Sequence, residues 1–271
     1  MAYREEVRVD VLLESFGSRW PELRRGALAA ERAGFDGVWL NDHLAGSVEA
    51  APHVLECWTI LSALAAEVPR IAVGPLVLNL ANRDPGTLAV MAATLQDVSA
   101  GRLLLGLGAG ARAGTTYALE QEALGRRVAT GPERRGALEQ AIAILRRVWS
   151  GAVSPAAGFL RPDPAPPIVV AGSGPKMAEL AGRTGDGICV PTGPRLAELI
   201  AVARQARARS GRDPEEMLVT ATVPSIPDRA QPWVGLGVDR LIVYVGPPFD
   251  QGVTRLGEIV TNWRRKLPRG G

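Results

Sequence analysis

The sequence contains few of the residues from which cross-links and metal sites are built. Among 271 residues there are two cysteines, Cys57 and Cys189, which lie far apart and without CxxC spacing, and two histidines, His43 and His53. A disulfide framework is therefore excluded. A metal site is not expected, because no carboxylate cluster accompanies the histidines. The default compartment for such a chain is the reducing cytoplasm.

Lysine and long apolar runs are also scarce. Lysine occurs only at Lys176 and Lys266, so nearly all of the 31 basic side chains are arginine. The arginine pairs are spread along separate segments and no aromatic residues interleave with them, which argues against a nucleic-acid partner. No segment approaches the run of about 20 apolar residues that a membrane helix needs. The charged segment Met1–Asp10 has no apolar core of a signal peptide. We therefore expect neither nucleic acid nor a membrane as a partner.

The chain instead consists of apolar, strand-like runs that alternate with segments of helical periodicity. The strand-like runs are Val7–Leu13, Gly37–Leu40, Ile71–Leu78, Leu103–Leu107, Ile168–Ala171, Gly187–Val190, Leu218–Val223 and Leu241–Val245. A hydrophobic content of 46% supplies enough side chains for a large core. Strict alternation of this length is typical of the α/β class and predicts one (β/α)₈ TIM-barrel domain over residues 1–271.

The helices are predicted from apolar spacing and capping residues. They are Pro21–Ala33, Glu56–Ala66, Leu88–Val98, Arg134–Trp149, Pro175–Arg183, Pro194–Arg209 and Val253–Trp263. Asp84 and Pro85 suit the N-cap and first position of the third of these. Three prolines between Val223 and Leu241 leave little room for a helix, so helix seven is expected to be short or missing. The proline-rich segment Gly151–Pro167 is not expected to be helical.

In a TIM barrel the loops that follow the strands form the active site. The candidate residues at these positions are Asn41, Asp42 and His43, then Asn79, then Gly108, Ala109 and Gly110, then Ala171, Gly172, Ser173, Gly174 and Pro175. The last group leads directly into a helix, where glycine, a hydroxyl and free N–H groups favour phosphate. The same residues would also suit an ordinary strand-to-helix turn that binds no ligand. Histidine exchanges protons near neutral pH, but Asp42 and His43 also suit a hydrogen-bonded loop without chemistry.

Taken in order, several segments resemble the luciferase-like monooxygenase superfamily. They are AGFDGVWLNDHL, PRIAVGPLV with N-x-x-x-R-x-P, AATLQDVSAGRLLLGLGAG and PIVVAGSGPKMAELAGRTGDGI. The likeness covers most of the chain from Phe35 to Val190. It is greatest to the F420-dependent branch, and within it to methylenetetrahydromethanopterin reductase-like members, especially in GSGPKMAELAG.

The resemblance implies a role for each candidate. Asp42 and His43 would lie beside the deazaflavin ring, as the catalytic pair. A bulge with a non-prolyl cis peptide at or near Leu76–Val77 would support the ring. The glycine-rich end at Gly108–Gly110 would bind cofactor, and Gly172–Gly174 would bind its phosphate. The implied activity is hydride transfer between F420 and a small organic substrate, in a homodimer packed through helices such as Glu56–Ala66 and Leu88–Val98.

The sequence also departs from the family. Several F420-dependent sugar-phosphate dehydrogenases have a glutamate directly after the glycines of strand four, where this chain has Ala111. A proton donor at that position is therefore missing, which argues against sugar-phosphate oxidation. The chain is also short within Gly151–Pro167 and Pro224–Gly237. An FMN-dependent monooxygenase and a cofactor-binding paralogue without activity stay open as alternatives.

Overall fold

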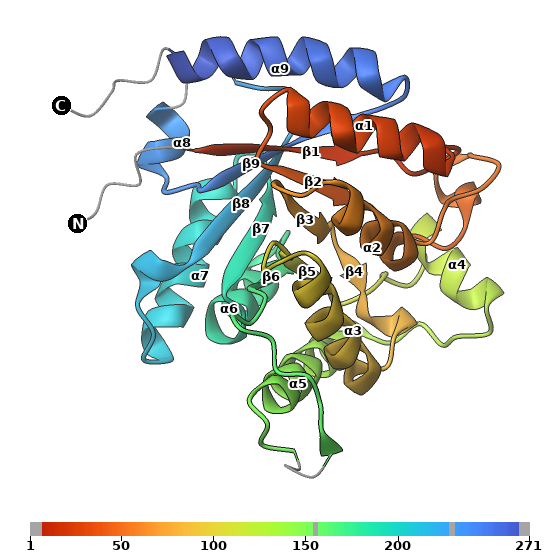
Figure 1. The fold of residues 1–271 in the computed structure, drawn as a ribbon. Helices are drawn as coiled ribbons and strands as arrows, with labels where there is room; N and C mark the ends of the chain where they lie inside the picture. The colour runs from red at the N-terminus through yellow and green to blue at the C-terminus, as the bar shows by residue number, and fades with distance from the viewer. Residues whose placement is uncertain (1–6, 154–156, 228–230, 266–271) are drawn as a thin grey trace.

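The computed structural model describes residues 7–153, 157–227 and 231–265. Its sheet has nine strands in the order β3-β2-β1-β9-β8-β7-β6-β5-β4, and all neighbours run parallel. The strands are β1 (Arg8–Leu13), β2 (Gly37–Leu40), β3 (Ala72–Pro75), β4 (Leu78–Asn79), β5 (Leu105–Gly108), β6 (Ile168–Ala171), β7 (Gly187–Pro191), β8 (Leu218–Val223) and β9 (Arg240–Val245). They form a nearly closed barrel (Figure 1), which confirms the predicted TIM-barrel fold.

The third predicted strand is divided into β3 and β4. The peptide bond between Leu76 and Val77 is cis, as the resemblance implies, and it lies between the two short strands. β3 pairs with β2, and β4 pairs with β5. A parallel bridge between Val73 and Leu103 connects the two sides. The predicted strand Ile71–Leu78 is therefore two short strands with the expected cis peptide between them, because this segment changes partners where the barrel closes.

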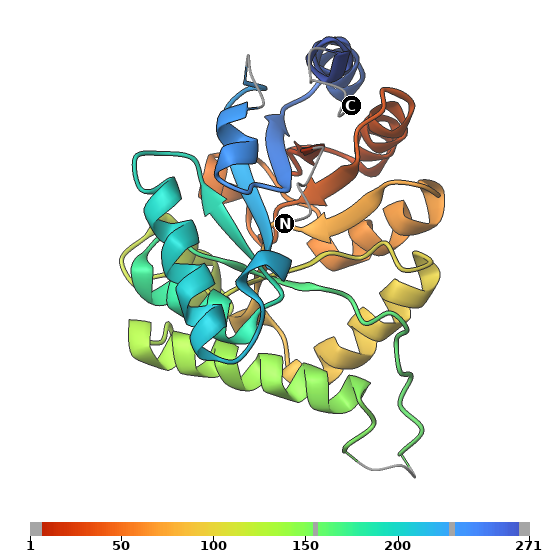
Figure 2. The same ribbon diagram turned by 90° about the vertical axis from the view of Figure 1, so that its left-hand side faces the viewer.

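Helices surround the strands (Figure 2). They are α1 (Trp20–Arg32), α2 (Cys57–Glu67), α3 (Pro85–Val98), α4 (Thr116–Ala123), α5 (Gly131–Trp149), α6 (Pro175–Thr184), α7 (Leu196–Arg209), α8 (Gln231–Gly235) and α9 (Phe249–Arg265). Asp84 caps α3, since its carboxylate accepts a 2.8 Å hydrogen bond from the Thr87 amide. No helix in the described ranges is long and apolar enough to cross a membrane.

The remaining differences from the sequence-based expectation lie in the loops. α8 is one short turn of helix, so the expectation for helix seven is confirmed. The described part of Gly151–Pro167 has no α-helix, as expected. α4 was not predicted, and α9 begins at Phe249 rather than at Val253. Short 3-10 turns cover Gly46–Glu49, Leu80–Asn82 and Pro214–Glu216.

Alternation along the strands divides the core into two layers. One set of strand side chains, such as Val9, Val11 and Val38, packs beneath the helices. The other fills the barrel interior around Trp39, Val169, Cys189 and Ile242. Branched and aromatic side chains thus fill the barrel, and its binding surface is left to the strand ends.

Candidate active site

A cavity of about 680 Å³ lies at the C-terminal ends of β2, β4, β5 and β6, within the usual size range of ligand pockets. Most of the predicted site residues line it: Asp42, His43, Leu76, Val77, Asn79, Gly108, Ala109, Gly110, Ala171 and Ser173. The others are not part of its lining: Asn41, Gly172, Gly174 and Pro175. The structure therefore brings together residues from four separate strand ends around one space.

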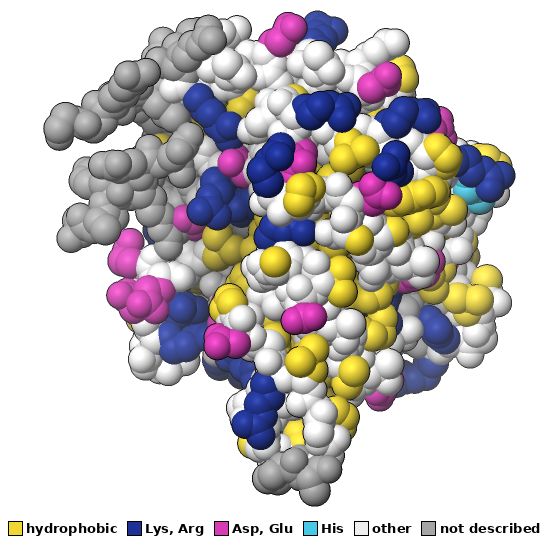
Figure 3. All heavy atoms as spheres, viewed as in Figure 1, with side chains coloured by type: hydrophobic (Ala, Val, Ile, Leu, Met, Phe, Trp, Pro, Cys, Tyr) yellow, Lys and Arg dark blue, Asp and Glu magenta, His cyan; other side chains and the backbone are white. Residues whose placement is uncertain are grey.

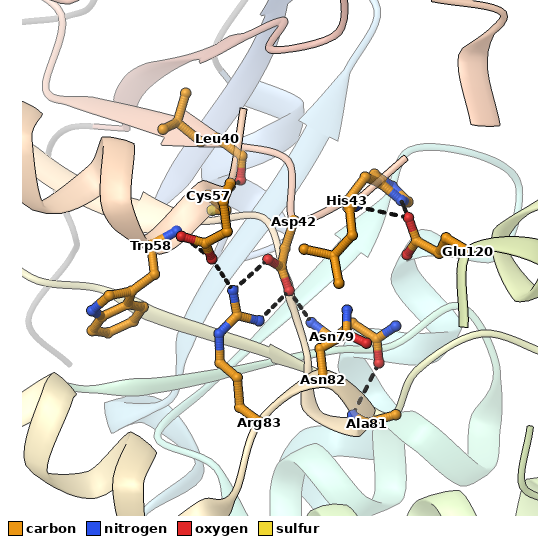
Figure 4. Close-up of polar contacts among 12 residues, drawn as sticks. Leu40, Asp42, His43, Cys57, Trp58, Asn79, Ala81, Asn82, Arg83 and Glu120 are labelled. Atoms are coloured by element: carbon orange, nitrogen blue, oxygen red, sulfur yellow. Dashed lines mark hydrogen bonds and ion pairs between the residues drawn. The ribbon is translucent and has the colours of Figure 1, made fainter. Parts of the chain in front are cut away.

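Asp42 is buried in a network that joins three loops (Figure 4). Its two carboxylate oxygens accept hydrogen bonds of 2.6 and 2.7 Å from the Arg83 guanidinium, and the Asn79 amide donates a further bond of 2.7 Å. Arg83 also binds Glu56, the N-cap residue of α2, at 2.6 Å. Burial alone would lower the pKa of Arg83, but Asp42 and Glu56 raise it above its ordinary value. Asp42 thereby connects the loop after β2 to the turn after β4.

His43 lies on the other side of this network, in an aromatic and acidic setting. Its ring stacks on Tyr117, with centroids 5.4 Å apart, and is tilted against Phe16 at 5.2 Å. Its Nδ1 lies 3.3 Å from a carboxylate oxygen of Glu120. Nε2 has no hydrogen-bond partner among the residues that the structure describes. The imidazole is therefore held on two faces and at one nitrogen, and its second nitrogen is available to a ligand.

Glu120 was not among the predicted residues. It lies on α4, its side chain is 1% exposed, and it also accepts a 2.9 Å hydrogen bond from the Leu44 amide. Burial raises the pKa of Glu120, but the bonds from His43 and from Leu44 outweigh this and lower it overall. A charged carboxylate next to His43 fixes the tautomer that carries a proton on Nδ1. The absence of an acid at Ala111 thus does not leave the site without a carboxylate.

The glycine-rich end of β5 forms the part of the cavity wall that adjoins the cis peptide. A Cβ on Gly108 would lie 2.7 Å from Cγ2 of Val77, so the Val77 side chain would have to shift to admit any other residue. Gly110 has a φ of +86°, and a Cβ there would lie 2.8 Å from the side-chain oxygen of Asn79. Because neither residue has a side chain, the backbone of both glycines is exposed directly to the cavity.

The turn between β6 and α6 has the features of an anion site. The backbone amides of Ser173, Gly174 and Lys176 contact no protein acceptor within the described ranges. A Cβ on Gly174 would meet no atom within 4 Å. Open amides at the N-terminus of a helix bind anions well, because the helix dipole adds to their hydrogen bonds.

The lining residues that sequence reasoning missed come mainly from the segment after β5 and the start of α5. They are Leu78, Ala111, Arg112, Thr115, Tyr117, Glu120, Gly131, Arg134, Arg135 and Met177. The helical signal of α4 is weak because its buried side chains include Glu120 and Gln121, residue types that usually lie on the surface. The pattern N-x-x-x-R-x-P did contain Arg83, but nothing in the sequence indicated that it pairs with Asp42.

Comparison with known proteins agrees with this geometry. The family model described as luciferase-like monooxygenase matches residues 6–232. An F420-dependent glucose-6-phosphate dehydrogenase from Microbacterium testaceum is 32% identical over 232 residues, which are 79% of this chain and 67% of the relative. An F420-dependent hydroxymycolic acid dehydrogenase from Mycobacterium tuberculosis is 34% identical over 218 residues, which are 76% of this chain and 59% of the relative.

Solved structures show the same fold at lower sequence identity. An F420-dependent secondary alcohol dehydrogenase, in complex with an F420–acetone adduct, has a TM-score of 0.79 and 18% identity, covering 94% of this chain and 98% of that one. The F420-dependent tetrahydromethanopterin reductase of Methanopyrus kandleri has a TM-score of 0.73 and 17% identity, covering 95% and 99%. At these identities the likeness concerns the fold.

Proposed function

We propose, from the premise that this chain belongs to the luciferase-like monooxygenase family, that it is an oxidoreductase transferring a hydride between coenzyme F420 and a small organic substrate. Relatives more than 30% identical are named as F420-dependent dehydrogenases. The observation that carries the proposal is the mouth cavity, the 680 Å³ space at the C-terminal ends of the strands. It brings together His43, the glycine-rich end of β5 and the turn before α6.

The cavity residues fit a flat ring joined to an anionic chain. Leu76, Val77, Ala109 and Met177 offer apolar surface to the ring, while Ser173 lies at the open amides before α6. When bound, F420 supplies a ring carbon that accepts or donates a hydride. The protein contributes position, exclusion of water and control of the proton.

Oxidation of a hydroxyl group to a carbonyl releases a proton together with the hydride, and we assign that proton to Nε2 of His43. Glu120 acts through His43 by holding Nδ1 and compensating the charge of the imidazolium. Reduction of a carbonyl would use the same two groups in the opposite sense.

We assign Asp42 a positioning role rather than a direct one. Both of its oxygens are occupied by Arg83 and the Asn79 amide. This network holds the loop after β2, which includes His43, against β4 and its adjoining cis peptide. Loss of Asp42 would therefore displace both His43 and the Leu76–Val77 peptide that we expect to support the cofactor ring.

The test is a titration of the purified apoprotein with F420 and with FMN, followed by turnover with secondary alcohols and ketones. We expect F420 to bind at least tenfold more tightly and to be reduced or oxidised by members of the panel. Preferred binding of FMN would favour the monooxygenase alternative. Binding of F420 without turnover on any substrate would favour the non-catalytic paralogue.

We also propose a homodimer of single-domain subunits in the cytoplasm. Hydrophobic side chains are visible over the face that α2 and α3 occupy (Figure 3). On α3, Val90 is 39% and Val98 is 51% exposed, a pattern that a partner helix would cover. Cys57 and Cys189 are buried free thiols, in keeping with a reducing compartment. Sedimentation equilibrium of the native chain against Val98→Glu tests the dimer.

A further inference from the structure

Three arginines line the cavity on one side. Arg112 lies in the loop after β5, and Arg134 and Arg135 lie in the first turns of α5. Arg112 is exposed, whereas Arg134 and Arg135 are half-buried. None of them belongs to the turn before α6 that the proposed cofactor site uses.

These three charges have no carboxylate partner within the described part of the chain. Several other arginines of the structure are paired, for example Arg83 with Asp42 and Arg183 with Glu139. The only hydrogen bond that their guanidinium groups make in the described ranges runs from Nη1 of Arg134 to the Gly110 carbonyl. Nε of Arg134 is buried without a hydrogen-bond partner.

The neighbouring acids are already bound elsewhere. Glu133 accepts hydrogen bonds from Arg127 and from the Thr130 amide. Glu120 is held by His43 and the Leu44 amide. Neither carboxylate contacts the three arginines, so the positive charge at this wall is not neutralised by the protein.

Positive charges at this spacing repel one another. Burial and the nearby charges of Arg135 and Arg112 lower the pKa of Arg134, as expected for like charges at close range. A bound anion would reverse this repulsion. The forked guanidinium suits phosphate and carboxylate groups, which it binds through paired hydrogen bonds.

We propose that Arg112, Arg134 and Arg135 form a second anion subsite in the mouth cavity, one that takes a phosphate or carboxylate group. The group belongs either to the substrate or to the acidic tail of the cofactor, and in that respect the inference rests on the proposed function. Arg134 anchors the subsite on Gly110, and Arg112 and Arg135 supply the donors that face the anion.

The test uses the double variant R112Q/R135Q, which keeps Arg134 and its bond to the glycine loop. The matched control is R147Q/R209Q, which removes two exposed arginines outside the cavity lining, one of them on the same helix. Binding of inorganic phosphate is measured calorimetrically at low salt, with and without F420. Affinities for F420 and for its ribityl deazaflavin, which lacks the phosphate and acidic tail, are measured by fluorescence. Circular dichroism checks that both variants are folded.

We expect phosphate binding to the apoprotein to weaken by about tenfold or more in R112Q/R135Q and to stay unchanged in the control. The ribityl deazaflavin should bind all three proteins equally. If F420 prevents phosphate binding to the wild type and itself binds the variant more weakly, the anion belongs to the cofactor tail. If F420-loaded wild type still binds phosphate and the loaded variant does not, the anion belongs to the substrate.

Equal phosphate affinity in wild type and R112Q/R135Q, or equal losses in variant and control, would overturn the subsite. Absence of phosphate binding to the wild type at low salt would overturn it as well. A different outcome separates the two proposals. If the wild type does not bind F420, and phosphate binding is weakened in R112Q/R135Q but not in the control, the proposed function fails and the subsite stands.

Discussion

Near the N-terminal ends of the strands, the buried charges of the barrel interior are paired with one another. The cavity at the C-terminal ends, the mouth of the barrel, instead has arginines without a carboxylate partner in the described ranges. At the closed, N-terminal end, Asp10 is 0% and Arg240 is 2% exposed. Asp10 accepts two hydrogen bonds of 2.7 Å from Arg240 and one of 2.8 Å from the Trp39 indole. At the mouth, Arg112, Arg134 and Arg135 have no carboxylate partner in the described ranges.

The contrast separates two uses of buried charge. A pair whose donors and acceptors are all matched leaves nothing for a ligand, so its part is to fix the packing of β1, β2 and β9. Charges in a cavity that no carboxylate neutralises are instead available to bind an anion. Changes at the closed end should therefore alter stability, and changes at the mouth should alter binding and rate.

The largest expected effect is that of Asp10→Ala. It leaves Arg240 buried without its partner, which should lower the free energy of unfolding by roughly 3–5 kcal/mol. Urea denaturation followed by circular dichroism measures this. Glu198→Ala, which breaks the exposed pair with Arg195, should leave the urea midpoint unchanged. A similar small effect for Asp10→Ala would remove the distinction between the two ends.

Next is His43→Ala at the mouth. Loss of the proton-transfer group should lower the turnover rate by roughly 10²- to 10⁴-fold with F420 saturating, while the unfolding midpoint changes little. His53→Ala is the control, because His53 contacts Ser18 and is not part of the cavity lining. An unchanged rate in His43→Ala would remove this residue from the chemistry.

Replacing Glu120 by Gln should have a smaller kinetic effect and a diagnostic pH dependence. We expect turnover to fall by roughly tenfold to a hundredfold, part of what acid–base catalysis supplies. The folded-state pKa of Glu120 is lowered. Its charge therefore contributes stability above the ordinary carboxyl value of about 4.3, and this contribution is lost as the pH falls through the lowered folded value.

The measurement for Glu120 is the difference in unfolding free energy between wild type and Glu120→Gln as a function of pH. It should be constant near neutrality and shrink as the pH falls below about 4. A difference that does not change with pH would mean that the carboxylate has no special stabilisation in the folded protein.

The smallest of these effects is that of Gly108→Ala. The added methyl group would press on Val77 in the cavity wall and destabilise the fold by about 1–3 kcal/mol. Cofactor affinity, measured by titration with F420, should fall in parallel. Gly136→Ala on α5 meets no atom within 4 Å, so it should stabilise the protein slightly by favouring the helix. An F420 affinity equal to that of the wild type in Gly108→Ala would show that Val77 can shift without disturbing the cofactor site.

Much of this fold could be read from periodicity, because short-range patterns report burial directly. β2, β6 and β8 begin and end at the predicted residues, and Asp84 caps α3 as expected. α4 escaped prediction because its buried face includes Glu120 and Gln121. The partner that stabilises the buried carboxylate of Glu120 is His43, which lies 77 positions away in the sequence.

The sequence by itself determined the alternation of strands and helices and the placement of polar and glycine residues after the strands. These features follow from apolar spacing and backbone preference, which are local. Only the tertiary structure decided the partners: Arg83 for Asp42, Glu120 for His43, and no carboxylate for the three arginines of the mouth in the described chain. Such pairings depend on contacts across the barrel, which no local pattern in the chain encodes.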